Sequence, residues 1–149
     1  MSATSQNNVW EKVELALKRF VVNNSAVGVN DSNVYCGHDN GIQRSPRIIC
    51  ECSSGVPESS GRKTGNWICT ATIYIKTKLH DETGEDNSGR FASILDSLED
   101  DDAPAVLSNN AEFITVFQHQ ITGFTKTIQG DTLVSEIGLT LTCCGSVIT

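Results

Sequence analysis

Two stretches of the chain alternate between apolar and hydroxyl-bearing residues, which predicts two long β-strands. In Trp67 to Lys78, one set of alternate positions is wholly apolar and the other is mostly polar: Trp67, Cys69, Ala71, Ile73 and Ile75 against Ile68, Thr70, Thr72, Tyr74 and Lys76. Thr132 to Cys144 repeats this arrangement, with apolar residues from Leu133 to Cys143 on one parity and Thr140 and Thr142 on the other. The sheet should therefore have an apolar face and a threonine-rich face. The second face is too polar for a core and too weakly charged for an ordinary solvated surface, which indicates a partner surface.

Helical periodicity predicts helices in three places. Apolar residues recur at helical spacing from Val9 to Val22, after Asn8, which can cap the helix, with Glu11 three residues further on. A second helix, capped by Asn87 or Ser88, has an i, i+3, i+4, i+7 stripe made of Phe91, Ile94, Leu95 and Leu98. Pro104 suits the first turn of a short third helix.

Shorter patterns complete the expected order of elements. We expect strands at Asn33 to Cys36, Arg47 to Ser53 and Glu112 to Gln120, and a turn at Gly130-Asp131 before the last strand. The Gly- and Ser-rich segment Ser53 to Asn66 is predicted to be a long, flexible hairpin loop. This order predicts an α+β fold: a single domain over residues 1–149, with a mainly antiparallel sheet of about five strands and helices packed on one face.

Composition and charge exclude several classes of function. A net charge of −7 argues against a protein that grips nucleic-acid phosphates, since such proteins usually carry a basic patch and a high pI. No apolar run approaches the length of a membrane span, and the segment MSATSQNNVWEK lacks the basic and apolar regions of a secretory signal. We therefore expect a soluble protein made in the cytoplasm, with no membrane partner.

The charges are unevenly distributed along the chain. Arg44 to Lys78 contains six basic and two acidic residues, a net charge of +4, whereas His80 to Asp102 contains one basic and nine acidic residues, a net charge of −8. Copies of such a molecule can attract one another head to tail, and contacts of that kind can close into a ring. The alternative is that these are solvated loops. The candidate interface residues are Arg62, Lys63, Lys76, Lys78, Asp81, Glu82, Glu85, Asp86, Asp100 and Asp101.

The sequence offers little catalytic or metal-binding chemistry. Cys36-x-His38 and Cys50-x-Cys52 supply soft metal ligands, but their spacing is shorter than structural zinc sites use, and Cys50 and Cys52 fall in a predicted strand. Cysteines in strands more often behave as small hydrophobic residues, and without an export signal their even number does not indicate disulfides. We predict no catalytic residue, metal or cofactor. The alternative is a small metal- or cysteine-dependent enzyme that uses Cys50, Cys52 and His38.

Several segments, taken in order, resemble the tail terminator and neck proteins of long-tailed bacteriophages. The resemblance covers most of the chain and rests on patterns of a fold, not on a signature motif. The segments are the N-terminal amphipathic helix, the RIICE strand with its Gly/Ser loop, TGNWICTATIYI at Thr64 to Ile75, GRFASILDSL at Gly89 to Leu98, and GDTLVSEIGLTLTCC at Gly130 to Cys144.

The resemblance implies a virion protein that forms a ring, commonly a hexamer, on the tail tube. Such a ring stops polymerisation of the tail tube protein and offers a surface to the head–tail connector protein, and DNA passes through its centre without specific binding. It would be assembled in the host cytoplasm. A head-completion or tail-tube protein of the same virion is the alternative within this class.

Overall fold

The computed structural model describes residues 9–24, 29, 33–37, 46–57, 66–79, 84–109 and 114–144. Within these ranges, three helices and a five-stranded sheet follow one another in an α+β order, as the sequence predicted. The helices are α2 (Val9–Val22), α3 (Gly84–Glu99) and α4 (Ala103–Asn109). The strands are β1 (Val34–Cys36), β2 (Arg47–Pro57), β3 (Asn66–Lys78), β4 (Thr115–Gln129) and β5 (Thr132–Cys144). No helix in these ranges is long and apolar enough to cross a membrane.

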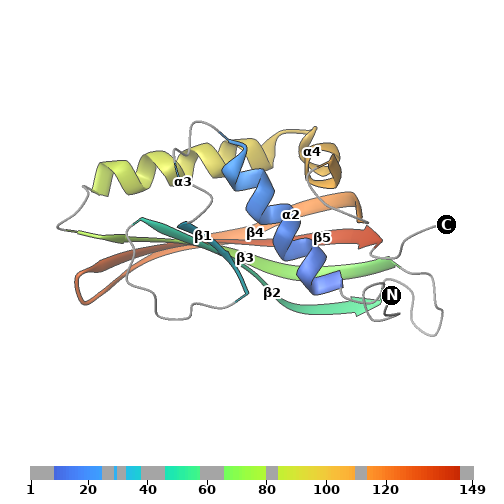
Figure 1. The fold of residues 1–149 in the computed structure, drawn as a ribbon, viewed down its shortest axis with the longest axis horizontal. Coiled ribbons are helices and arrows are strands. Elements are labelled where there is room, and N and C mark those ends of the chain that lie inside the picture. The colour runs from blue at the N-terminus through green and yellow to red at the C-terminus, as the bar shows by residue number, and fades with distance from the viewer. Residues whose placement is uncertain are drawn as a thin grey trace.

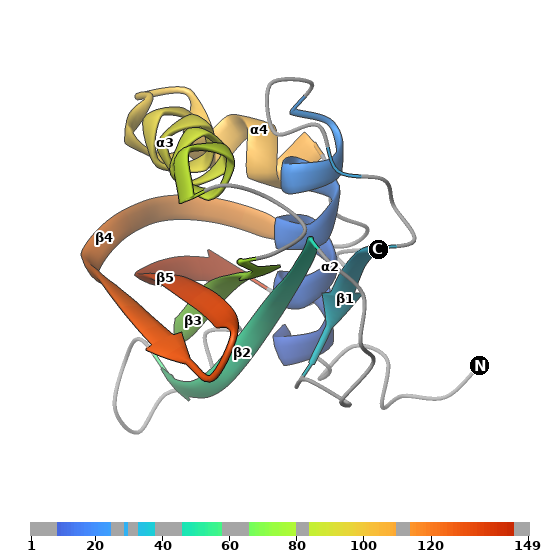
Figure 2. The same cartoon turned by 90° about the vertical axis from the view of Figure 1, so that its left-hand side faces the viewer.

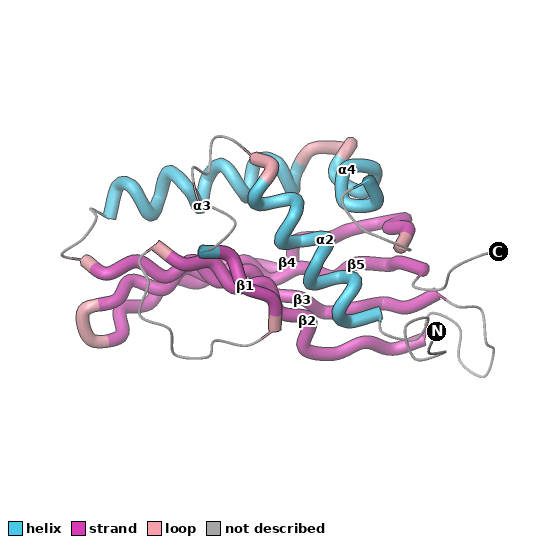
Figure 3. Tube along the Cα trace, viewed as in Figure 1, coloured by secondary structure: helices cyan, strands magenta, loops and turns pink. Residues whose placement is uncertain are grey.

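The sheet has the order β1-β2-β3-β5-β4, and every pair is antiparallel except β1 with β2. Figures 1 and 3 show the three helices lying together on one side of the strands. The end-on view in Figure 2 shows that the sheet is strongly twisted, so that β4 curves beneath α3. The right-handed twist of individual strands accumulates along strands of this length and produces such a shape.

The alternation in β3 and β5 determines which face is buried. Ile73 and Ile75 of β3 and Ile137, Leu139 and Leu141 of β5 are all fully buried, because this face packs against the helices. The predicted helical stripes meet them from the other layer, with Val13 and Leu17 from α2 and Ile94 and Leu98 from α3 fully buried in the same cluster. Burial of such side chains stabilises the fold by about 1.5–3 kcal/mol each.

Several predicted boundaries differ from those of the structure. β2 continues through Pro57, so the predicted loop Ser53 to Asn66 begins too early and ends one residue too late; residues 58–65 lie outside the described part of the chain. Helix α3 begins at Gly84, before the predicted cap at Asn87 or Ser88. β4 extends to Gln129, beyond the predicted end at Gln120, because β5 supplies backbone partners along its length. Gly130 makes the predicted tight turn with a φ of 65°, a left-handed conformation that glycine adopts readily.

Candidate functional site

The predicted basic interface residues Lys76 and Lys78 lie near the end of β3, on the face opposite the helices. Lys76 pairs with Arg47 at the start of β2, so these three cations share one end of the sheet. Lys76 Nζ lies 5.9 Å from the centre of the Tyr74 ring, within range of a cation–π interaction. The structure therefore brings part of the predicted basic region together. Arg62 and Lys63 lie outside the described residues.

The predicted acidic residues separate into two groups. Asp100 and Asp101 are exposed in the turn between α3 and α4, where Asp100 Oδ1 accepts a hydrogen bond of 3.0 Å from the Asp102 amide. Glu85 and Asp86 belong to the first turn of α3, and Asp81 and Glu82 lie outside the described residues. Because α3 has 16 residues, its two ends are separated by about 24 Å. The acidic segment thus spans the molecule and does not form one patch.

The threonine-rich face is partly exposed: Ile49 and Val134 are buried near its basic end, and the threonines lie further along the strands. Thr70 is exposed and pairs directly with the half-buried Thr140 in the middle of the sheet. The neighbouring strand β4 adds Gln118 and Gln120 to the same face, because they pair with Thr142 and Thr140. The described helices lie on the other face, so among the described residues these hydroxyl and amide groups are not covered by a helix.

The outer strand β4 exposes apolar side chains that the sequence analysis did not select. Phe117 is 50% exposed, Phe124 59% and Ile128 65%. Phe124 makes an edge-to-face contact with Phe91 of α3, with ring centroids 5.3 Å apart, and Lys126 Nζ lies 5.0 Å from the Phe91 ring. β5 pairs with one edge of β4, and none of the described strands covers the other edge. The sequence does mark this strand in one way: the fifteen residues of β4 include a single basic residue, Lys126, and no acidic residue.

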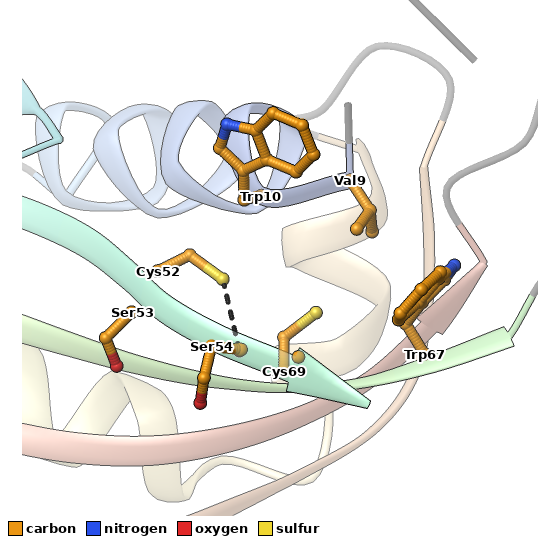
Figure 4. A pocket seen from close by; sticks show the side chains of 8 residues that line it. Val9, Trp10, Cys52, Ser53, Ser54, Trp67 and Cys69 are labelled. Carbon is orange, nitrogen blue, oxygen red and sulfur yellow. Dashed lines mark hydrogen bonds between the residues drawn. The ribbon is translucent and has the colours of Figure 1, made fainter. Parts of the chain in front are cut away.

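A pocket of about 270 Å³ opens between the start of α2 and the ends of β2 and β3. Val9 and Trp10 of α2 and Trp67 of β3 contribute apolar walls, and Ser53 to Gly55 of β2 line it from the strand side. Figure 4 shows the sulfur atoms of Cys52 and Cys69 between α2 and the two strands. The sequence offered one signal for this pocket, since Trp10 is a large apolar residue outside the apolar stripe of its helix. In the structure its side chain is 47% exposed.

The thiols around this pocket are poorly suited to nucleophilic chemistry. A hydrogen bond with Cys143, whose sulfur lies 4.0 Å away, raises the pKa of Cys69 to about 12. The pKa of Cys52 is also raised. The main cause is a hydrogen bond with Cys69, and burial is the second. Burial likewise raises the pKa of Cys50 well above its usual range. Because the thiolate is the reactive form, thiols that stay protonated at neutral pH are weak nucleophiles.

All six cysteines are free thiols. Cys50 belongs to the core and Cys52 packs against it, on the helix-facing side of β2, as expected for strand cysteines that behave as small hydrophobic residues. His38 lies outside the described residues. Within the described ranges, no three His, Cys, Asp or Glu side chains are grouped closely enough to hold a metal ion.

Comparison with solved structures finds the same fold in a virion. A chain described as part of the "Virion of native gene transfer agent (GTA) particle" superposes with a TM-score of 0.59 at 11% sequence identity. The match covers 95% of this chain and 98% of the other, so the shared fold includes essentially the whole of both. No protein-family profile and no curated protein sequence matches this chain.

Proposed function

We propose that this chain is a structural virion protein that forms a ring at the head-proximal end of a phage tail tube. In this role it ends tube polymerisation and joins the tail to the head connector. The likeness to a chain of a gene transfer agent virion carries the proposal, because it extends over 95% of this chain and 98% of the other. The order of sequence segments that resembles tail terminators supports the same role.

The surface of the molecule is consistent with assembly. The partly exposed face rich in threonine and glutamine and the exposed apolar side chains of β4 are features of a surface that meets partners. We infer that copies of this chain, most simply six, associate laterally and present these surfaces to each other, to the tail tube protein and to the connector. A net charge of −7 suits a channel through which DNA slides, because phosphates would be repelled and not retained.

A head-completion or tail-tube protein is the second candidate, since the same fold and surfaces would serve either position in a virion. The enzyme hypothesis has less support. Its two described cysteines, Cys50 and Cys52, have raised pKa values and lie in the core or against it.

The decisive experiment combines mass measurement with a polymerisation assay. We expect light scattering and negative-stain microscopy of the purified protein to show a closed ring. When the ring is added to polymerising tail tube subunits of the same virion, it should bind one tube end and reduce the mean tube length. Incorporation along the whole tube would identify a tube protein instead. A monomer that binds neither tubes nor connectors would refute the structural role.

A further inference from the structure

The sheet has two lateral edges that other described strands leave partly unpaired. On one side, β4 is the last strand. On the other side, β1 pairs only with Ile48, Ile49 and Cys50 of β2, so the outer edge of β2 from Glu51 to Pro57 has no neighbouring strand within the described chain. The amide of Cys52 donates a hydrogen bond of 2.9 Å to Glu14 Oε2, so among the described residues Ser53 to Pro57 form the part of this edge without a neighbouring strand.

The open stretches of both edges lack charged side chains, although Pro57 and a β-bulge between Cys52 and Ser54 interrupt the edge of β2 and two bulges interrupt β4. Natural edge strands are commonly guarded by charged side chains, lysine above all, that disfavour pairing with another chain. Thr115 to Thr125 of β4 contains no Asp, Glu, Lys or Arg, and neither does Cys52 to Pro57 of β2. Each stretch instead exposes an apolar side chain, Phe117 at 50% and Val56 at 55%. Charge-free edges of this kind suit strands that become covered in an assembly.

The directions of the two edge strands are compatible with pairing between identical copies. The four strands β2, β3, β5 and β4 are neighbours in this order and each pair is antiparallel, so β2 and β4 run in opposite directions. A rotation about an axis along the strands keeps every copy in the same orientation. β4 of one copy then meets β2 of the next in antiparallel alignment, which is the geometry of the rest of the sheet.

The pocket beside β2 is at the same end of the sheet as Phe117. Val116, the residue before Phe117, pairs with Cys143, which pairs in turn with Trp67 at the pocket wall. A β-bulge between Val116 and Gln118 places Phe117 outside the regular pairing of β4 with β5. Phe117 is thus an exposed aromatic ring at one lateral edge of the sheet, and the apolar pocket lies beside the other edge at the same level along the strands. Such a pair of surfaces is what a head-to-tail contact between copies requires.

We propose that copies of this chain associate edge to edge, with Phe117 of one copy seated in the Trp10–Trp67 pocket of the next. This inference rests on the proposed ring and names the contact that closes it. Aromatic side chains that fill apolar pockets are typical anchors of protein interfaces. The contact also explains why Trp10, which the core does not use, is at the pocket rim.

The contact can be trapped as a disulfide, because Cys52 lines the pocket. In a Cys36→Ser background, which removes an exposed thiol, Phe117→Cys should come close to Cys52 of the neighbouring copy. The oxidation is carried out at alkaline pH and over a long incubation, because Cys52 reacts slowly while its thiol stays protonated. Diamide accepts the two thiol hydrogens and is reduced to the hydrazine, while an S–S bond forms between the subunits. Non-reducing gels should show a ladder of covalent multimers, and addition of Cys52→Ser should abolish it.

Phe124→Cys is the matched control, since Phe124 is a similarly exposed phenylalanine of β4 at a level closer to the other end of the sheet. It should give no ladder that depends on Cys52. In a thiol-intact chain, Phe117→Ser should weaken ring association at least about tenfold, and Phe124→Ser should have a smaller effect. Circular dichroism melts of each variant verify the fold.

The outcomes separate this contact from the ring itself. A ring of unchanged mass in Phe117→Ser, together with no Cys52-dependent ladder in Phe117→Cys, would overturn the contact and leave the ring in place. A parent protein that is monomeric by light scattering would overturn the ring and the contact with it.

Discussion

At the scale of single residues, Glu14 is the side chain that joins the first helix to the sheet. It is only 7% exposed, although the apolar stripe of α2 surrounds it, and its carboxylate accepts a hydrogen bond from the Cys52 backbone amide on β2. A buried carboxylate is retained where it satisfies a donor that would otherwise lose its water without compensation. Here it satisfies the edge of β2 at the point where β1 has ended.

Glu14→Ala should destabilise the protein by about 1–3 kcal/mol, because the Cys52 amide would be left without its acceptor. Glu14→Gln keeps an acceptor oxygen at this position and should recover part of the loss. Urea denaturation followed by circular dichroism measures both. Equal stability of the alanine and glutamine variants would show that the hydrogen bond is not what stabilises this contact.

The buried thiol of Cys50 predicts a loss of stability at alkaline pH. Its pKa is raised in the folded protein, chiefly by burial, so above about pH 8.5 the unfolded chain loses a proton that the folded chain retains. The stabilisation is complete below the unfolded pKa and decreases as the pH rises, by about 1.4 kcal/mol per pH unit for one thiol. Denaturation midpoints at pH 7.5, 8.5 and 9.5 test this slope. Cys50→Ala should reduce the slope by that amount, and an unchanged slope would exclude Cys50 as its source.

At the scale of elements, the short helix α4 holds the beginning of β4 against the core. Ser108 Oγ donates a hydrogen bond of 2.8 Å to the Pro104 carbonyl and accepts one of 2.8 Å from the Val116 amide. At the end of α3, His119 Nε2 is hydrogen-bonded to the Leu98 carbonyl. These polar contacts fix an edge strand that has few buried side chains of its own.

Ser108→Ala should destabilise the start of β4 more than the rest of the sheet. The Val116 amide loses its acceptor, which costs about 1–3 kcal/mol when the group stays buried. Hydrogen exchange at Val116 should accelerate, while exchange in the centre of β3 should change no more than global stability requires. Ser88→Ala, which removes the 3.3 Å hydrogen bond that Ser88 Oγ accepts from Lys126 near the far end of β4, is the control. Unchanged protection of Val116 would contradict a role for Ser108 in holding β4.

At the scale of the whole molecule, the predicted basic residues lie at one end, with Glu85 and Asp86 of the first turn of α3, and a second acidic group lies at the other end. Lys76 and Lys78 lie with Arg47 at the end of the sheet where α3 begins, and Asp100 and Asp101 follow the opposite end of α3 (Figure 1). If basic and acidic ends meet between subunits or between stacked rings, the association is sensitive to ionic strength, because exposed charge pairs are screened over about 8–10 Å.

Raising the salt concentration should therefore shift the ring towards smaller species in sedimentation velocity. A double variant, Lys76→Gln with Lys78→Gln, should weaken association at low salt and reduce its salt dependence. Exposed pairs contribute up to about 1 kcal/mol each, which corresponds to roughly a fivefold change in affinity. Lys18→Gln on α2 is the control for loss of charge alone. An association with the same affinity at low and high salt would show that the contacts are apolar.

The sequence by itself determined the two faces of the sheet and the helices that cover one of them. Residues from Trp67 to Lys78 alternate with the period of a strand, and Val9 to Val22 repeats with the period of a helix, so burial follows from local spacing. The hairpin turn at Gly130 was equally predictable, because glycine tolerates the left-handed backbone that the turn requires.

Only the tertiary structure decided the strand order, the length of β4 and the position of the pocket. From Thr122 to Gln129, β4 is exposed on both faces, so no alternation of apolar and polar residues marks this segment as a strand. It is a strand only because its backbone pairs with β5. Ser53 to Pro57 were assigned to a loop for the same reason. Trp10 and Trp67 are distant in sequence and line one pocket because α2 crosses β2 and β3. Side-chain periodicity encodes burial against a core, whereas backbone pairing at an exposed edge depends on a neighbour that lies far away in the chain.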